Sequence, residues 1–320
     1  MGYDICVVGN DEASFEVLNL AASLHQRAIA MLPKVRHSGW LVSEALQSLI
    51  TNLLVDCDHK RRGLFRRSAS PALLRSLISR AITDELDEHV KILRQLGVDL
   101  SFGDATVEAQ DSQSRMLMVR NDGEVFETRH LVLCTGIRHR NLQRRIGDFR
   151  VHSPESLMQL RSLPVAVGVI GGEDFGAGLA GMLSLLGVDT GLVTRREHVS
   201  AMLDLALDTG VKVVEHPSQL ISILQQKARR PEIVDCRRTV GYTSHLNLNR
   251  LDIEPDENGK LWCASNMETW SPHVFGAGSV VGFAPDTALH PTLQAEKILA
   301  SIMPQQGSNE AAASYLRVPA

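Results

Sequence analysis

The chain has 320 residues, of which 44% are apolar and 22% are charged, and its formal net charge is −4. A chain of this length can bury a large core and is expected to form two domains. The small net charge gives no general attraction to nucleic acid or to an anionic membrane, so neither is expected as a partner.

Cysteine and histidine usage gives no sign of a metal site. The five cysteines form no C-x-x-C pair, and the twelve histidines form no ligand spacing, so no metal is predicted. The sequence shows no signal peptide and no long apolar span, and a cytoplasmic protein is therefore expected.

The N-terminal segment follows a strand, turn, helix, strand order. Tyr3–Gly9 is an apolar strand running into a turn, Ala13–Leu24 has helical spacing, and Ala28–Leu32 is a second strand. The following segments are expected to be helices at Leu41–Leu54 and Pro71–Leu96, a loop at Asp58–Arg67, a hairpin or meander over Val107–Thr128, and a buried strand at His130–Gly136.

The most informative stretch is Leu163–Glu197. It contains an apolar strand at Val165–Ile170, a helix at Phe175–Leu186, and a second strand that runs through Val193. This order is a β-α-β unit, the building block of dinucleotide-binding folds.

The glycine-rich turn of this unit departs from the dinucleotide fingerprint Gly-x-Gly-x-x-Gly. Gly171 and Gly176 hold the first and third places, but the second place, where a phosphate touches backbone, is Glu173. Arg195 and Arg196 end the second strand, where an NADP 2′-phosphate would lie. The interpretation that the two arginines are solvated charges at the end of a strand has equal weight.

The N-terminal turn departs in the same sense, since Gly9, Asp11 and Ser14 occupy the three glycine places. An acidic residue at a helix start accepts hydrogen bonds from the N–H groups that would otherwise bind phosphate. Asp11 and Glu12 in the first turn, and Glu173 and Asp174 in the second, are therefore expected to exclude phosphate. One like-charge pair at about 5 Å costs roughly 3 kcal/mol at an effective dielectric of about 20. The alternative is that Glu173 turns to solvent and leaves its turn usable.

The rest of the chain continues the alternation of strands and helices. The expected segments are a helix at Val199–Thr209, strand segments at Val211–Glu215, Ile233–Gly241, Leu251–Cys263 (with a turn at Glu257-Asn258-Gly259) and Val274–Val281, a closing helix at Thr287–Ile302, and a mobile tail at Gln305–Ala320. The basic run 60–67 is interpreted as a solvated loop, with contact to RNA, an acidic partner or a phosphate group as the alternative.

Taken in order, six segments resemble the flavoprotein disulfide reductases, or pyridine nucleotide-disulfide oxidoreductases, and most of all their soluble pyridine nucleotide transhydrogenase branch. The segments are YDICVVG, HSGWLVSEAL, LVLCTGIRHR, VIGGEDFGAGLAGMLSLLG, RRTVGYTSHLNLNRLDIEPDENGKL and SPHVFGAGSVVG.

The resemblance implies an α/β fold with two Rossmann-like domains. An FAD-type domain would comprise 1–154 and 266–304, an NAD(P)-type domain at 155–265 would be inserted in it, and 305–320 would be the tail. The family dimerisation domain is expected to be absent, so the family homodimer is not expected. The cofactor-binding positions implied by the resemblance are Gly9, Gly136 and Gly278 for FAD, and Gly171, Gly176, Arg195 and Arg196 for NAD(P).

The departures from the family pattern lie at positions that, by the resemblance, contact a ligand or take part in the redox chemistry. Val35–Gly39 has no redox cysteine, Glu44 replaces the lysine beside the flavin, Ser279 replaces the aspartate that holds the ribityl chain, and Arg237 replaces the glycine before the family arginine. The family acid/base pair belongs to the missing domain, so no catalytic residue is assigned.

Two hypotheses of different class follow. The first is a pseudoenzyme that keeps the scaffold, binds no cofactor, and binds an unknown protein partner or small ligand. The alternative is an active FAD-dependent oxidoreductase that passes hydride from NADPH through flavin to NAD.

Overall fold

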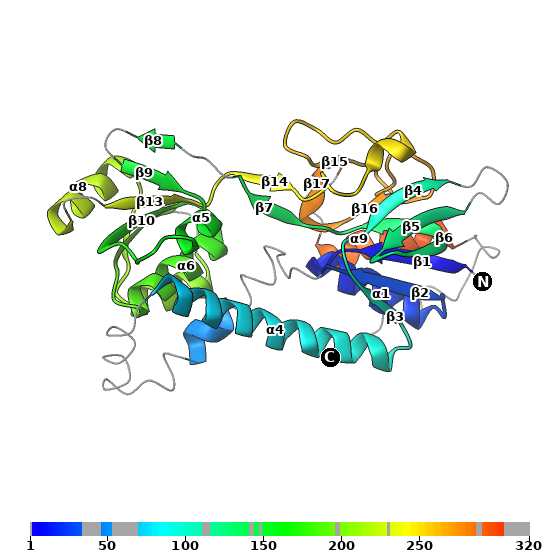
Figure 1. Cartoon of the computed structure of the whole chain (residues 1–320), viewed down its shortest axis with the longest axis horizontal. Helices are drawn as coiled ribbons and strands as arrows, with labels where there is room; N and C mark the ends of the chain where they lie inside the picture. The colour runs from blue at the N-terminus through cyan, green and yellow to red at the C-terminus, as the bar shows by residue number, and fades with distance from the viewer. Residues whose placement is uncertain are drawn as a thin grey trace.

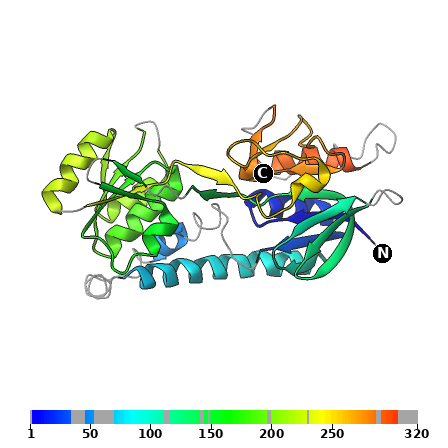
Figure 2. The ribbon, with the colours of Figure 1, turned by 45° about the horizontal axis from the view of Figure 1, so that its top comes forward.

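The computed structural model describes residues 2–33, 46–52, 70–110, 116–140, 144–146, 149–195, 199–228, 231–285 and 290–303. Two β-sheets lie at opposite ends of the long axis, each covered by helices (Figure 1). We call the part built on the N-terminal sheet the first lobe and the part built on the central sheet the second lobe. The long helix α4 (Pro71–Gln95) packs against both lobes and runs along one side of the molecule (Figure 2).

The first lobe is built on a seven-stranded sheet with the order β3-β2-β1-β6-β5-β4, and β16 lies beside β6. β1 pairs in parallel with β2 and β6, whereas β4, β5 and β6 form an antiparallel meander. Parallel central strands are buried on both faces, which is why β1 and β2 are nearly continuous apolar runs. The elements are β1 Tyr3–Val8, α1 Glu12–Ser23, β2 Ala28–Leu32, β3 Asp99–Phe102, β4 Thr106–Gln110, β5 Leu117–Asn121, β6 Glu124–Leu133, β16 Val274–Gly276 and α9 Pro291–Ile302.

The second lobe is built on a six-stranded sheet with the order β12-β11-β10-β13-β9-β8. All neighbours are parallel except β8 and β9, and helix α6 lies against α7, β10 and β11. The elements are β8 Arg144–Ile146, β9 Phe149–His152, α5 Pro154–Met158, β10 Ala166–Ile170, α6 Glu173–Leu185, β11 Asp189–Val193, α7 Ala201–Asp208, β12 Lys212–Val214, α8 Pro217–Lys227 and β13 Glu232–Asp235.

An antiparallel pair of short strands, β7 (Ile137–His139) and β14 (Thr239–Gly241), joins the two lobes (Figure 2). The remaining short elements belong to the first lobe and are the 3-10 turns Leu248–Leu251 and Gly278–Val280 and the paired strands β15 Leu261–Trp262 and β17 Val281–Phe283. The expected α/β class, with the second Rossmann-like unit inserted into the first, is confirmed by this order of strands.

Contacts between distant residues show where the chain passes between the two sheets. Val151 of β9 lies beside Ile233 of β13, so the chain has entered the second sheet before residue 154. On the return, the 3-10 turn Leu248–Leu251 packs on β4 of the first lobe well before residue 266. Both crossings are set by contacts between residues far apart in sequence, which local periodicity does not record.

Several predicted elements need correction. His130–Gly136 is no separate strand, because β6 runs without a break from the meander into the buried segment. The closing helix begins at Pro291 rather than at Thr287, and helix α8 was not predicted. Of the expected helix Leu41–Leu54, residues 46–52 are described and are helical, while the expected loop Asp58–Arg67 and the tail lie outside the described residues.

Within the part of the chain that the structure describes, no helix combines the length and the apolar character needed to cross a membrane.

Candidate functional site

The turn after β1 leads directly into the N-terminus of helix α1. Gly9 adopts a positive φ of 122°, and Asp11 is the N-cap of the helix. The Asp11 carboxylate accepts a hydrogen bond of 2.8 Å from the backbone N–H of Glu12. The predicted capping of this helix by an acidic side chain is therefore confirmed.

The same carboxylate also holds the segment that follows β16. Oδ2 of Asp11 accepts hydrogen bonds from the backbone N–H of Ser279, at 3.1 Å, and from the Ser279 hydroxyl. A Cβ on Gly278 would lie 3.0 Å from Cγ of Asp11, so the two segments are in close contact. The neighbouring N–H of Gly278 donates to Oε1 of Gln294, at 2.7 Å. Side chains of this chain thus accept from three backbone N–H groups that face this turn.

Asp11 is almost fully buried, with 4% of its surface exposed. Burial raises the pKa of its carboxyl, and this effect exceeds the opposing effect of the hydrogen bonds from Ser279 and Glu12. A phosphate oxygen needs the same N–H groups and the same space at a helix N-terminus. The donor set around Asp11 therefore does not fit a phosphate group in this position.

A cavity of only about 10 Å³ lies at the carboxyl ends of β1 and β2 and is lined by Gly9, Met31, Thr135 and His245, among others. This is the volume of about one water molecule. The Thr135 hydroxyl and Nδ1 of His245 are buried without a hydrogen-bond partner among the described residues. Gly136, with φ of 72°, follows Thr135.

The second glycine-rich turn follows β10 and has a different construction. Gly171 and Gly172 have φ of 65° and 85°, and Gly172 is the N-cap of α6 with no side-chain hydrogen bond to the cap. Glu173 has φ of 45° and is exposed. The expectation that Glu173 caps this helix is therefore wrong, because its side chain turns to solvent. The alternative stated from the sequence, that the Glu173 side chain turns to solvent, describes its position correctly.

Arg237 covers this turn instead. A Cβ on Gly171 would overlap Cγ of Arg237, so the aliphatic part of the arginine lies directly on the glycine. Nε and Nη2 of Arg237 donate to the two carboxylate oxygens of buried Asp235, each at 3.0 Å, and the Arg237 N–H donates to the same carboxylate at 3.0 Å. The sequence identified Arg237 as a departure, but nothing in it indicated that the side chain covers Gly171.

The other predicted positions of the second lobe are only partly brought together. A Cβ on Gly176 would overlap the carbonyl oxygen of Gly171, which explains why glycine is needed where the helix packs on the turn. Arg195 is exposed after the end of β11 and forms no ion pair with the described residues. Arg196, Glu44 and the basic run 60–67 lie outside the described residues.

Four cysteines, Cys6, Cys134, Cys236 and Cys263, are described, and all are buried and unbridged. Burial raises the pKa of each thiol, that of Cys263 to about 12. A thiol kept protonated and away from solvent is a poor nucleophile. The described residues also contain no group of three or more histidine, cysteine or acidic side chains that could hold a metal ion.

Comparison with known proteins gives a consistent assignment. A family model described as pyridine nucleotide-disulphide oxidoreductase matches residues 3–297. The soluble pyridine nucleotide transhydrogenase of Hahella chejuensis is 24% identical over 315 residues, covering 88% of this chain and 67% of that protein. The transhydrogenase of Chromohalobacter salexigens is 22% identical over 317 residues with the same coverage.

Two solved structures share the fold at low sequence identity. LpdA from Mycobacterium tuberculosis aligns with a TM-score of 0.61 and 16% identity, covering 93% of this chain and 72% of that one. The HOCl-induced flavoprotein disulfide reductase RclA from Escherichia coli aligns with a TM-score of 0.60 and 14% identity, covering 96% and 72%.

Proposed function

Because this chain belongs to the pyridine nucleotide-disulphide oxidoreductase family, we propose that it is a member that keeps the two-lobe scaffold and works without FAD. It acts as a pseudoenzyme that binds a protein partner or a small ligand. The observation that supports this proposal is the position of the Asp11 carboxylate, which accepts from the N–H of Glu12 and from both the N–H and the hydroxyl of Ser279.

The energetic argument compares Asp11 with a phosphate. When ionised, Asp11 would lie about 5 Å from a phosphate bound at the start of α1, and such a pair costs roughly 3 kcal/mol at an effective dielectric of about 20. This is on the order of a hundredfold in affinity. The phosphate would also have to break the three hydrogen bonds that Asp11 already accepts.

The test is to move the carboxylate from position 11 to position 279, where the family carries an aspartate. The natural protein is expected to purify without visible flavin absorbance, and added FAD should keep its free fluorescence. Asp11→Gly/Ser279→Asp should bind FAD measurably, because the N–H donors are released and the ribityl partner is supplied.

Ser279→Asp alone is the matched control. It brings a second carboxylate against buried Asp11 without freeing any donor, so it should bind no FAD and should be less stable. Thermal melts show which variants are folded. Stoichiometric flavin in the natural protein after gel filtration would refute the proposal.

The second candidate function is an FAD-dependent oxidoreductase that passes hydride from NADPH to NAD. The observation that favours it is that Gly171 and Gly176 remain in the second turn and Glu173 points to solvent. In this function Arg237, which packs on Gly171, has to move away when the nucleotide binds. NADPH-dependent reduction of an NAD analogue by the protein supplied with FAD would establish this function instead.

A further inference from the structure

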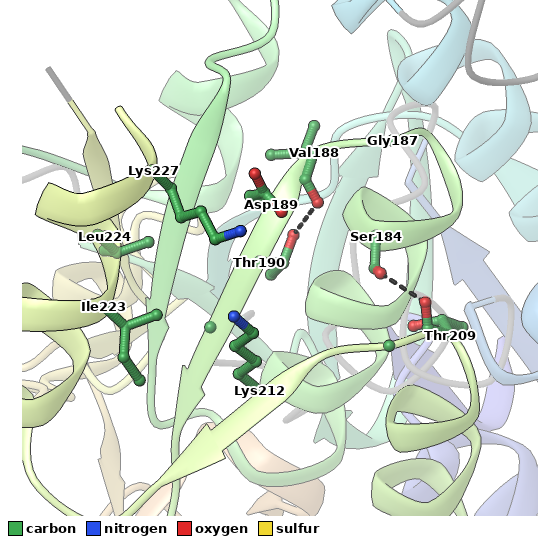
Figure 3. A pocket seen from close by; sticks show the side chains of 12 residues that line it. Ser184, Gly187, Val188, Asp189, Thr190, Thr209, Lys212, Ile223, Leu224 and Lys227 are labelled. Carbon is green, nitrogen blue, oxygen red and sulfur yellow. Dashed lines mark hydrogen bonds between the residues drawn. The ribbon is translucent and has the colours of Figure 1, made fainter. Parts of the chain in front are cut away.

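A cavity of about 270 Å³ lies in the second lobe, at the amino-terminal ends of β11 and β12 (Figure 3). Its walls come from the end of α6, the turn before β12, and helix α8. The glycine turn that follows β10 lies at the opposite edge of the same sheet. A strand of five residues spans about 16 Å, so the cavity is separate from that turn.

Two lysines reach into this cavity from different elements. Lys212 at the start of β12 and Lys227 at the end of α8 extend toward one another across β11 (Figure 3). No ion pair joins either ammonium group to a carboxylate of the described residues. Asp189 also lines the cavity, so its lining carries two positive charges and one negative, a net charge of +1 in a chain of net charge −4.

The hydroxyl groups of the lining are already committed as donors. Ser184 Oγ donates to the carbonyl of Thr209 at 2.8 Å, and Thr190 Oγ1 donates to the carbonyl of Val188 at 3.0 Å. Thr209 Oγ1 donates to the carbonyl of Ala206 at 2.7 Å. A hydroxyl has one proton and two lone pairs, so each of these groups can only accept from a ligand.

We propose that this cavity binds a small polyhydroxylated anion, the chemistry shared by sugar phosphates and hydroxy acids. Lys212 and Lys227 supply charge-assisted donors for the anionic group. Ser184 and Thr190 accept from the hydroxyl groups of the ligand, and Leu224 contributes an apolar wall. The volume is slightly below the range of about 300–1,000 Å³ typical of drug-sized ligand sites, which suits a small metabolite.

The two lysines supply the test, by isothermal titration calorimetry with named probes. Glucose 6-phosphate and gluconate represent the phosphate and the carboxylate source, and glucose and inorganic phosphate each lack one half of the proposed chemistry. We expect saturable binding of at least one of the first two probes, and weaker binding of glucose and of phosphate. Lys212→Ala/Lys227→Ala should weaken that binding about tenfold or more, since two charge-assisted hydrogen bonds are lost.

The matched control is Lys91→Ala/Arg94→Ala, which removes two exposed positive charges from α4 and should leave affinity unchanged. Lys212→Gln/Lys227→Gln removes both charges but keeps most of the side-chain length, and it gives the same readout if the alanine variant folds poorly. Absence of saturable binding by both glucose 6-phosphate and gluconate would overturn the proposal. Equal affinity in the lysine variants and the natural protein, or inorganic phosphate binding as tightly as glucose 6-phosphate, would overturn it too.

Discussion

At the scale of single residues, one carboxylate decides the character of the first glycine-rich turn. Asp11 caps α1 and holds the segment at Ser279, two tasks that need an acceptor in the place where the fingerprint has glycine. A side chain so deeply buried must also respond to pH, because its ionised form loses hydration.

The pH response of Asp11 has a definite sign. The pKa of Asp11 is raised by burial in the folded protein, so its contribution to stability is fully present below the unfolded pKa and is lost as pH rises through the folded pKa. Asp11→Asn keeps a capping side chain but cannot ionise. We expect the free energy of unfolding of the natural protein, relative to Asp11→Asn, to decrease as pH rises from about 4 toward neutrality. Urea denaturation at a series of pH values measures this difference, and a constant or increasing difference would contradict the assignment.

Glu173 is a second residue whose backbone is unusual, because its φ of 45° favours glycine. The left-handed conformation costs roughly 1–2 kcal/mol for a residue with a Cβ, of which about 0.5–1 kcal/mol is offset by the larger unfolded entropy of glycine. Glu173→Gly is therefore expected to raise the free energy of unfolding by about 0.5 kcal/mol relative to Glu173→Ala, which removes the charge but keeps the strain. Chemical denaturation of the two variants decides this, and equal stabilities would contradict it.

At the scale of elements, the start of α6 depends on a contact from another strand. Arg237 follows β13, packs on Gly171, and is held there by Asp235. Replacing Arg237 alone would leave the Asp235 carboxylate buried beside an empty space, which is costly. Replacing both Asp235 and Arg237 is therefore the way to uncover the glycine-rich turn after β10 without leaving a buried, unpaired carboxylate.

Asp235→Asn/Arg237→Gly opens the turn while retaining the acceptor for the N–H of residue 237. Combined with Glu173→Gly/Asp174→Ala, it should bind NADPH with a dissociation constant below about 1 mM, because the α6 N–H groups become accessible and neither acidic side chain of the first turn opposes phosphate. Glu173→Gly alone should not bind, since Arg237 still covers Gly171. Calorimetry with NADPH compares the variants. Tight NADPH binding by the natural protein would instead support the active enzyme.

The contrast between the two turns shows what a sequence can predict. The capping by Asp11 depends on the next residue in the chain, so local chemistry was sufficient to predict it. The side chain that covers Gly171 comes from a residue 66 positions away, and the paired residues of β9 and β13 are 82 positions apart. Likewise, the periodicity of strands and helices predicted both Rossmann-like units, whereas the approach of Lys212 and Lys227 depends on how α8 packs on the sheet.

At the scale of the whole molecule, the two lobes are joined by few elements. The linker strands β7 and β14 and the helix α4 connect them, and the His139 side chain adds a contact between β7 and the second lobe. The His139 ring lies 4.5 Å, centroid to centroid, from the ring of Phe175 on α6, and Nδ1 lies 3.1 Å from Oε1 of Glu155 on α5. The His139 side chain is only 9% exposed, so this contact fixes the linker against the second lobe.

Removing this contact should loosen the second lobe without disturbing the first. His139→Ala loses both the ring contact and the hydrogen bond, and we expect a loss of about 1–3 kcal/mol in the free energy of unfolding of the second lobe. Glu155→Gln keeps a hydrogen-bond acceptor and should have a smaller effect.

Although burial alone raises the pKa of Glu155, the hydrogen bond and charge of His139 bring it below its ordinary value. Stability from Glu155 is therefore present above the unfolded pKa and is lost as pH falls through the folded pKa. Scanning calorimetry should show this acid loss in the natural protein and not in Glu155→Gln, and an identical acid loss in both proteins would show that the pair does not link the lobes.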